Sequence, residues 1–131
     1  GILLDLGEFI LNLADSNARR YLKAGVAMEL SKTQEEIEAA ALAASAKPSG
    51  GHGHGAAEAV DPNALIVAEM ERYKPAIRDS IISVLSSKTS DELATTPGKE
   101  LSKEQIKESV DAIFDGNREV LRVSFGSFFI Q

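Results

Sequence analysis

The chain has 131 residues, of which 44% are hydrophobic, so it is long and apolar enough for one domain with one core. Its 20 acidic and 14 basic side chains give a net charge of −6, and no run of lysine and arginine occurs, which argues against nucleic acid as a partner. The chain has no cysteine, which excludes disulfides, thiolate catalysis and cysteine-based zinc or iron–sulfur sites.

Two β-strands are predicted before residue 31. Phe9, Leu11 and Leu13 alternate with other side chains, which predicts a short strand at residues 8–13. The alternation is clearer in residues 21–30 and indicates an antiparallel sheet covered on one face by helices, a mixed α+β fold. The side chains that share the apolar face of this strand are Leu22, Ala24, Val26, Met28 and Leu30.

An alanine-rich helix and a glycine-rich segment are expected next. Thr33 and Glu36 have the spacing of a capping box, so a helix is predicted from there to about Ser45. Its only large apolar side chains are Ile37 and Leu42, and we expect it to dock weakly. Residues 47–57 contain glycine, proline and histidine with little to bury, which predicts a flexible loop within a single domain of residues 1–131.

The strongest helical pattern begins at Asp61-Pro62, with aspartate as the N-cap and proline in the first turn. We expect a kink near Pro75, because proline lacks an amide hydrogen and crowds the preceding turn. The apolar side chains that recur at steps of three and four are Ile66, Met70, Tyr73, Ile77, Ile81 and Val84.

Two further helices and a strand complete the pattern. A short helix is predicted from Ser90 and is stopped by Pro97-Gly98. The capping-box spacing of Ser102 and Gln105 predicts the start of another helix, which ends near Gly116. Its apolar face consists of Ile106, Val110, Ile113 and Phe114.

The last predicted strand covers residues 119–130. Leu121, Val123 and Phe125 share one parity and the later apolar residues Phe128 and Ile130 the other, so we expect a bulge near Gly126-Ser127. Core packing is the favoured interpretation of the phenylalanines at 125, 128 and 129. The alternative is that one face of this strand stays exposed as an interface.

No catalytic, cofactor-binding or metal-binding residue is predicted. His52 and His54 could bind a metal, but the chain has only these two histidines and no fixed carboxylate beside them, so ordinary loop histidines are favoured. Arg78 and Asp79 lack a second ionisable partner at a suitable spacing, which favours an ion pair or a polar interface patch. Gly98-Lys99 lacks the rest of a phosphate-binding loop.

Several short segments occur in a fixed order along the chain: Pro75-Ala76-Ile77-Arg78-Asp79, Ile81-Ile82, Leu85-Ser86-Ser87-Lys88-Thr89, Glu92-Leu93, Gly98-Lys99 and Leu101. Together with Tyr21-Leu22-Lys23, Glu29-Leu30 and the C-terminal Phe128-Phe129-Ile130-Gln131, they resemble the signature of FliL, the flagellar basal-body-associated family. The resemblance covers most of the chain from Tyr21 onward, without the Gly/His loop.

This resemblance implies a single-pass inner-membrane protein whose C-terminal periplasmic domain is similar to the stomatin/prohibitin (SPFH) core and builds rings. The chain begins without methionine and contains no apolar stretch of about 18 residues, so we expect the membrane helix to precede it. The implied partners are other copies of the chain and the flagellar stator proteins MotA and MotB, and the implied role is support of torque and motility. No enzymatic activity or cofactor comes with the resemblance.

The residues expected to contact protein partners are Arg78, Asp79 and Lys88 as polar contacts, and Phe128 and Phe129 as apolar contacts. Two alternatives stay open at this point. One is a stomatin-like membrane scaffold unrelated to flagella, and the other is a metal-binding module that uses His52 and His54.

Overall fold

The computed structural model describes residues 1–45 and 61–131. The predicted loop at residues 47–57, with His52 and His54, lies outside the described residues. None of the helices in the described part is long and apolar enough to cross a membrane. The elements are β1 (Ile2–Asn12), β2 (Tyr21–Leu30), α1 (Gln34–Ser45), α2 (Pro62–Ser86), α3 (Ser90–Ala94), α4 (Thr96–Phe114) and β3 (Val120–Ile130).

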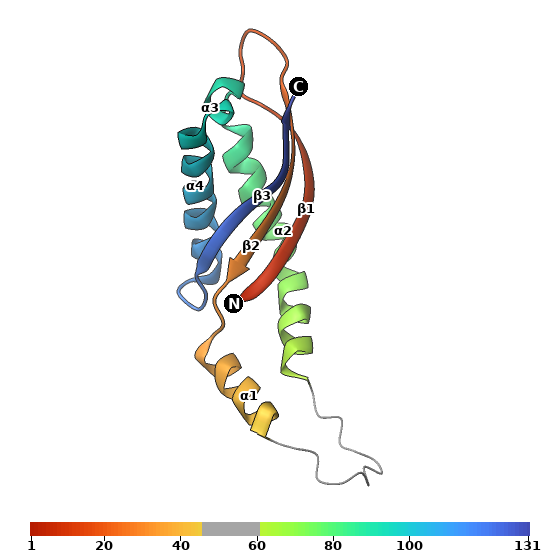
Figure 1. Cartoon of the computed structure of the whole chain (residues 1–131), viewed down its shortest axis with the longest axis vertical. Coiled ribbons are helices and arrows are strands. Elements are labelled where there is room, and N and C mark those ends of the chain that lie inside the picture. Colours follow the sequence, from red (N-terminus) through yellow and green to blue (C-terminus); the bar gives the residue numbers. More distant parts are fainter. Residues whose placement is uncertain (46–60) are drawn as a thin grey trace.

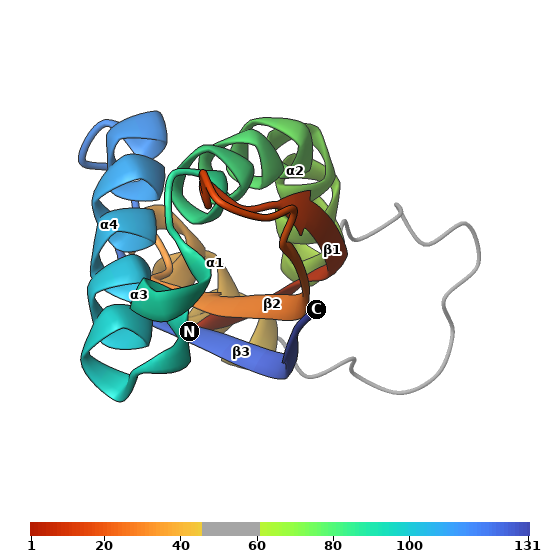
Figure 2. The same ribbon diagram turned by 90° about the horizontal axis from the view of Figure 1, so that it is seen from above.

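The three strands form an antiparallel sheet in the order β1-β2-β3. Helix α2 packs against β1, α4 packs against β3, and the two helices contact each other. Figure 2 shows both helices on the same side of the sheet, while the opposite side carries no helix. This arrangement confirms the predicted α+β class with a small antiparallel sheet packed by helices.

The core lies between the sheet and helices α2 and α4. Strand β2 supplies one complete face to it, since all five side chains predicted for that face are buried. Burying one large apolar side chain stabilises a fold by about 1.5–3 kcal/mol, so the face of β2 is a principal source of stability. The buried side chains of the two long helices are Ile66, Met70, Ile77, Ile81 and Leu85 from α2, and Ile106, Val110 and Phe114 from α4.

Strand β1 begins earlier than the sequence predicted. It starts at Ile2 and contains a register shift between Asp5 and Glu8, where Gly7 adopts φ of 78°. The bulge switches the parity of the buried residues from Leu4 and Leu6 to Phe9 and Leu11. The prediction of a strand limited to residues 8–13 was wrong. The bulge at Gly7 interrupts the alternation of apolar and polar residues, so the alternation did not show that the strand continues on both sides of the glycine.

Helix α1 has the predicted capping box. The Thr33 backbone N–H donates to Glu36 Oε1 at 2.9 Å, and the Glu36 N–H donates to Thr33 Oγ1 at 3.2 Å. The helix buries none of its residues, which confirms weak docking. Figure 1 shows α1 beyond the end of the sheet, beside the first turns of α2.

Helix α4 begins six residues before the predicted capping box at Ser102. The Thr95 side chain accepts from the Gly98 N–H at 3.0 Å, and Pro97 lies in the first turn, where proline is favoured. Ser102 lies inside the helix and donates its hydroxyl to the Gly98 carbonyl at 3.0 Å. The helix ends as predicted, with Gly116 at φ of 85°.

Strand β3 contains the predicted bulge. Its register with β2 shifts opposite Ala24 and Val26, so both Phe125 and Phe128 face the helices. A second shift near Leu30 turns Val120 into the core and leaves Leu121 52% exposed. The predicted placement of Leu121 on the same face as Val123 was therefore wrong.

Candidate protein-contact surface

The described residues hold no group of three or more histidine, cysteine, aspartate or glutamate side chains that could bind a metal ion. The candidate site is the face of the sheet that is turned away from α2 and α4, here called the outer sheet face. Figure 2 shows that no helix covers it.

The outer sheet face exposes large apolar side chains on both edge strands. The exposed fractions are 83% for Leu3, 72% for Ile10 and 58% for Phe129. The strand register places Ile10, Lys23 and Phe129 in one row across the three strands. Exposed apolar side chains beside one another are a feature of protein interfaces.

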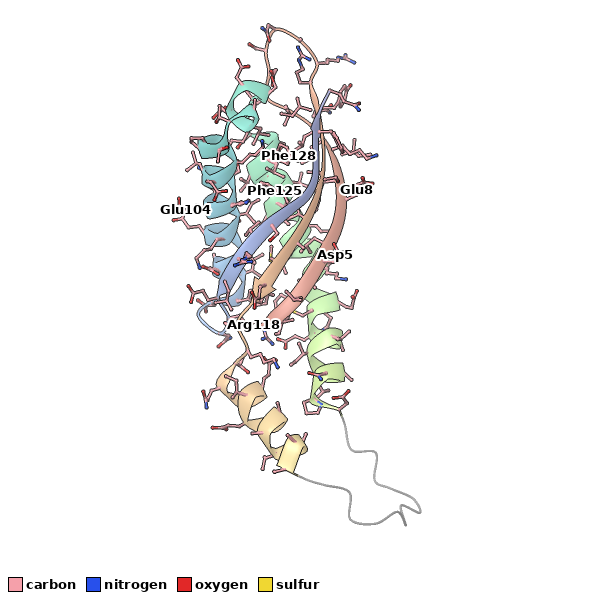
Figure 3. All side chains as sticks on the ribbon, viewed as in Figure 1. Asp5, Glu8, Glu104, Arg118, Phe125 and Phe128 are labelled. Atoms are coloured by element: carbon pink, nitrogen blue, oxygen red, sulfur yellow. The ribbon has the colours of Figure 1, made fainter. Side chains whose placement is uncertain are left out.

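A hollow of about 690 Å³ lies in the middle of this face. It exists because small residues, among them Gly25, Ala27 and Gly126, line its floor. A Cβ at Gly25 would have Ser127 Oγ as its nearest neighbour at 3.6 Å, so the space above the strand is open. Carboxylates border the hollow on the β1 side, where Figure 3 shows Asp5 and Glu8.

Arg78 of α2 holds the bulge of β1. Its guanidinium lies over the Phe9 ring at 3.9 Å from the centroid and donates to the carbonyl oxygens of Leu6 and, at 3.3 Å, of Glu8. These are the carbonyls on either side of Gly7. Arg78 was expected to contact a partner, and the structure shows that its donors bind its own chain.

Replacing Arg78 with alanine is expected to lower the free energy of unfolding by about 1–3 kcal/mol. The change removes a cation–π contact and the charged donor for two backbone carbonyls. Urea denaturation followed by circular dichroism measures the loss. Asp79→Ala, at the exposed neighbouring position, is the matched control and should change stability by less than about 0.5 kcal/mol. Equal losses in the two variants would contradict the assigned role.

The other four predicted contact residues lie in different environments. Lys88 is 8% exposed, and its carbonyl accepts from the Ala14 N–H at 2.8 Å. Phe128 is half-buried, with its ring centroid 5.1 Å from that of Phe125. Asp79 on α2 and Phe129 on β3 are exposed. Of the predicted set, these two present their side chains most fully to a partner.

A buried ionic cluster surrounds Arg118, just before β3, and no pattern in the sequence predicted it. Its guanidinium donates to both carboxylate oxygens of Glu36, to Glu69 Oε2 at 2.9 Å and to the Ser31 carbonyl at 3.1 Å. Hydrogen bonds from Arg118 lower the pKa of Glu36 below its ordinary value. Figure 3 shows Arg118 at the end of the sheet, where the cluster joins α1 and α2 to the body of the domain.

An uncovered, partly apolar sheet face on an acidic α+β domain is a feature typical of protein-binding modules. The family model described as flagellar basal body-associated protein FliL matches residues 3–131. A similar protein is the flagellar protein FliL of Aquifex aeolicus (strain VF5), which is 28% identical over 132 residues. The alignment covers 100% of this chain and 62% of that relative.

The chain therefore belongs to the FliL family of flagellar basal-body accessory proteins. It spans about 62% of the length of the relative it matches. The family is described as flagellar basal body-associated, and the relative is a flagellar protein.

Proposed function

We propose that this domain is a non-enzymatic accessory module of the flagellar motor that associates with the MotA–MotB stator complex and supports torque. It acts on the periplasmic side of the inner membrane, held there by a helix outside this chain, and assembles with other copies into a ring. The same family membership that links the chain to the basal body supports a motor partner. Tethering to one membrane would raise the effective concentration of weakly interacting surfaces.

The single observation that carries the proposal is the uncovered outer sheet face. Leu3, Ile10 and Phe129 stay exposed although they are large and apolar, and burial against another protein would remove this area from water. Such a face suits binding better than catalysis, because it combines exposed apolar side chains with a shallow hollow, which Leu3 lines.

A strain without the gene is expected to assemble flagella and to swim more slowly than its parent as the viscosity of the medium rises. Load requires more torque, so loss of stator support has its largest effect there. Swimming speed is measured at rising viscosity, with flagella counted by electron microscopy. Parent-like swimming at every load would contradict stator support and favour a general stomatin-like scaffold.

Self-association through the outer sheet face predicts crosslinks between copies in the membrane-anchored protein. A photo-crosslinking phenylalanine analogue at position 129 reacts with whichever surface of a neighbouring copy lies against it, as the head-to-tail contact of a ring requires. We expect irradiation to form dimers on a denaturing gel. The matched control carries the analogue at position 42, since Leu42 is also apolar and exposed but lies on α1. Monomers alone, or equal dimers from both variants, would contradict contact through this face.

A further inference from the structure

Strand β3 has backbone groups that no neighbouring strand satisfies. The Tyr21 N–H donates to the Gln131 carbonyl at 2.8 Å, and the Gln131 N–H donates to the Tyr21 carbonyl at 2.9 Å. Pairs that exchange both bonds alternate along an antiparallel ladder with pairs that exchange none. The N–H and C=O groups of Phe128 and Ile130 therefore point away from β2, toward the free edge.

The same alternation continues past the bulge. Because every second residue of β2 faces β3, Ser124 and Arg122 are the bonded partners there, and Val123 and Phe125 turn their backbone groups to the free edge. The backbone groups of Val120 also point away from β2. Its N–H donates to Asp111 Oδ1 at 2.7 Å and its carbonyl accepts from Lys107 Nζ at 2.9 Å, and both partners lie on α4.

Helix α4 satisfies only the first of these edge residues. Beyond Val120, a groove of about 590 Å³ separates α4 from residues 120–124 of β3. Figures 1 and 2 show α4 running beside this strand. Among the hydrogen bonds of residues 1–45 and 61–131, none outside the sheet ladder reaches the backbone of Val123, Phe125, Phe128 or Ile130. A free strand edge beside a helix is the geometry in which extended peptides add to a sheet.

The opposite edge of the sheet is protected against such addition. Strand β1 carries the Gly7 bulge, and Arg78 binds the carbonyls of Leu6 and Glu8 there. Charged side chains at an edge are one means by which edge strands avoid pairing with other chains. Strand β3 also contains bulges, but no side chain of the described residues binds its edge groups beyond Val120, and this difference makes β3 the edge that is open to a partner.

Basic side chains lie next to the open part of β3. Lys99 Nζ is 5.2 Å from the Phe128 ring centroid, and Lys103 Nζ is 5.4 Å from that of Phe125. Lys99 and Arg122 have no carboxylate partner among the ion pairs of the described residues, whereas Lys103 is paired with Glu100 at 3.2 Å. Glu100 and Glu104 line the same groove together with Lys103, Lys107 and Arg122. With Lys99 beside Phe128, four cations face two carboxylates along this edge, and in a chain of net charge −6 this local excess favours an acidic partner segment.

We propose that the β3 edge accepts an extended acidic segment of another protein as a fourth strand. The backbone groups of Val123, Phe125, Phe128 and Ile130 supply the ladder bonds, and Lys99 and Arg122 bind the carboxylates of the added strand. This goes beyond the proposed function, because it requires neither a ring nor a stator partner.

Amide hydrogen exchange with a short peptide that repeats Glu-Glu-Val-Val tests the proposal, because this repeat places carboxylates on both faces of the added strand, where Lys99 and Arg122 lie. Without peptide, the amides of Val123 and Phe128 should exchange faster than those of Ser124 and Phe129, and saturating peptide should slow them by about tenfold or more. A control peptide N-methylated at every residue has no amide hydrogen to donate at either edge, so it cannot form the ladder and should give no protection. Absence of protection, or equal protection by both peptides, would overturn strand addition.

The charge preference is tested with substitutions of side chains that leave the ladder intact. Lys99→Glu with Arg122→Glu should weaken binding of the glutamate peptide by about tenfold, the effect of losing two surface ion pairs. Arg72→Glu with Lys74→Glu makes the same change in net charge on α2, which packs against β1, and should leave the dissociation constant unchanged. Equal weakening by both double variants, or tighter binding of a lysine-valine peptide, would overturn the acidic segment as occupant.

Discussion

Replacement of Arg118 with alanine is expected to lower the free energy of unfolding by about 3–5 kcal/mol. The Arg118 side chain is 1% exposed, and it binds Glu36 of α1, Glu69 of α2 and the Ser31 carbonyl. Its removal leaves the carboxylates of Glu36 and Glu69 close together in a partly buried site without their cation. This loss destabilises the fold far more than the loss of an exposed ion pair. Urea denaturation at neutral pH, followed by circular dichroism, measures the loss.

Two further variants separate charge pairing from simple loss of packing. Lys74→Ala breaks an ion pair of 2.8 Å with Glu71 on the surface of α2 and should cost less than about 1 kcal/mol. The triple variant Arg118→Met, Glu36→Leu and Glu69→Leu removes all three charges and should recover most of the lost stability. A triple variant as unstable as Arg118→Ala would contradict the electrostatic explanation.

The cluster also gives the domain an acid-sensitive contribution to stability. Hydrogen bonds from Arg118 are the main reason why the pKa of Glu36 is lowered in the folded state. A carboxyl group with a lowered folded pKa stabilises the fold fully above its unfolded pKa, and the contribution is lost as the pH falls through the folded value. Between neutral pH and about pH 3, the wild type should therefore lose more stability than Arg118→Ala, which lacks this link.

Local patterns in the sequence predicted the elements whose structure depends on neighbours along the chain. The alternation of β2, the capping box of Thr33 and Glu36 and the apolar face of α2 are all local, and the structure confirms them. The start of α4 was predicted at the wrong place because Ser102 and Gln105 have the spacing of a capping box. Thr95, followed by Pro97 in the first turn, is a second possible N-cap, and the spacing of residues alone does not show which of the two N-caps begins the helix.

The contacts of the candidate surface depend on residues that are distant in sequence. Arg78 meets carbonyls 70 and 72 residues away, and Arg118 meets carboxylates 49 and 82 residues away. Arg78 was expected at the surface and Arg118 had no predicted role, since isolated charges usually lie on solvated faces. Core packing was the favoured interpretation of Phe129, which is 58% exposed, and the two-sided apolar pattern of the last strand indicated exposure only as the alternative.

The second large effect is expected at Gly98, in the first turn of α4. A Cβ built there would lie 1.6 Å from the Glu92 carbonyl oxygen and 2.7 Å from its carbonyl carbon, at the corner between α3 and α4. Both contacts are with backbone, so no side chain can rotate away, and the two helices would have to separate. We expect Gly98→Ala to lower the free energy of unfolding by about 3 kcal/mol, the upper range of overpacking effects.

Two other glycines are matched controls for this substitution, and all three variants are compared by urea denaturation. Gly126→Ala places a Cβ no closer than 4.0 Å to its nearest neighbour, the Gly25 carbonyl oxygen, and should change stability by less than about 0.5 kcal/mol. Gly116→Ala meets no atom within 4 Å but has φ of 85°, so it should cost about 1–2 kcal/mol through backbone strain alone. A Gly98→Ala loss no larger than that of Gly126→Ala would show that the corner between α3 and α4 yields freely, and steric contact would then not explain why glycine occupies this position.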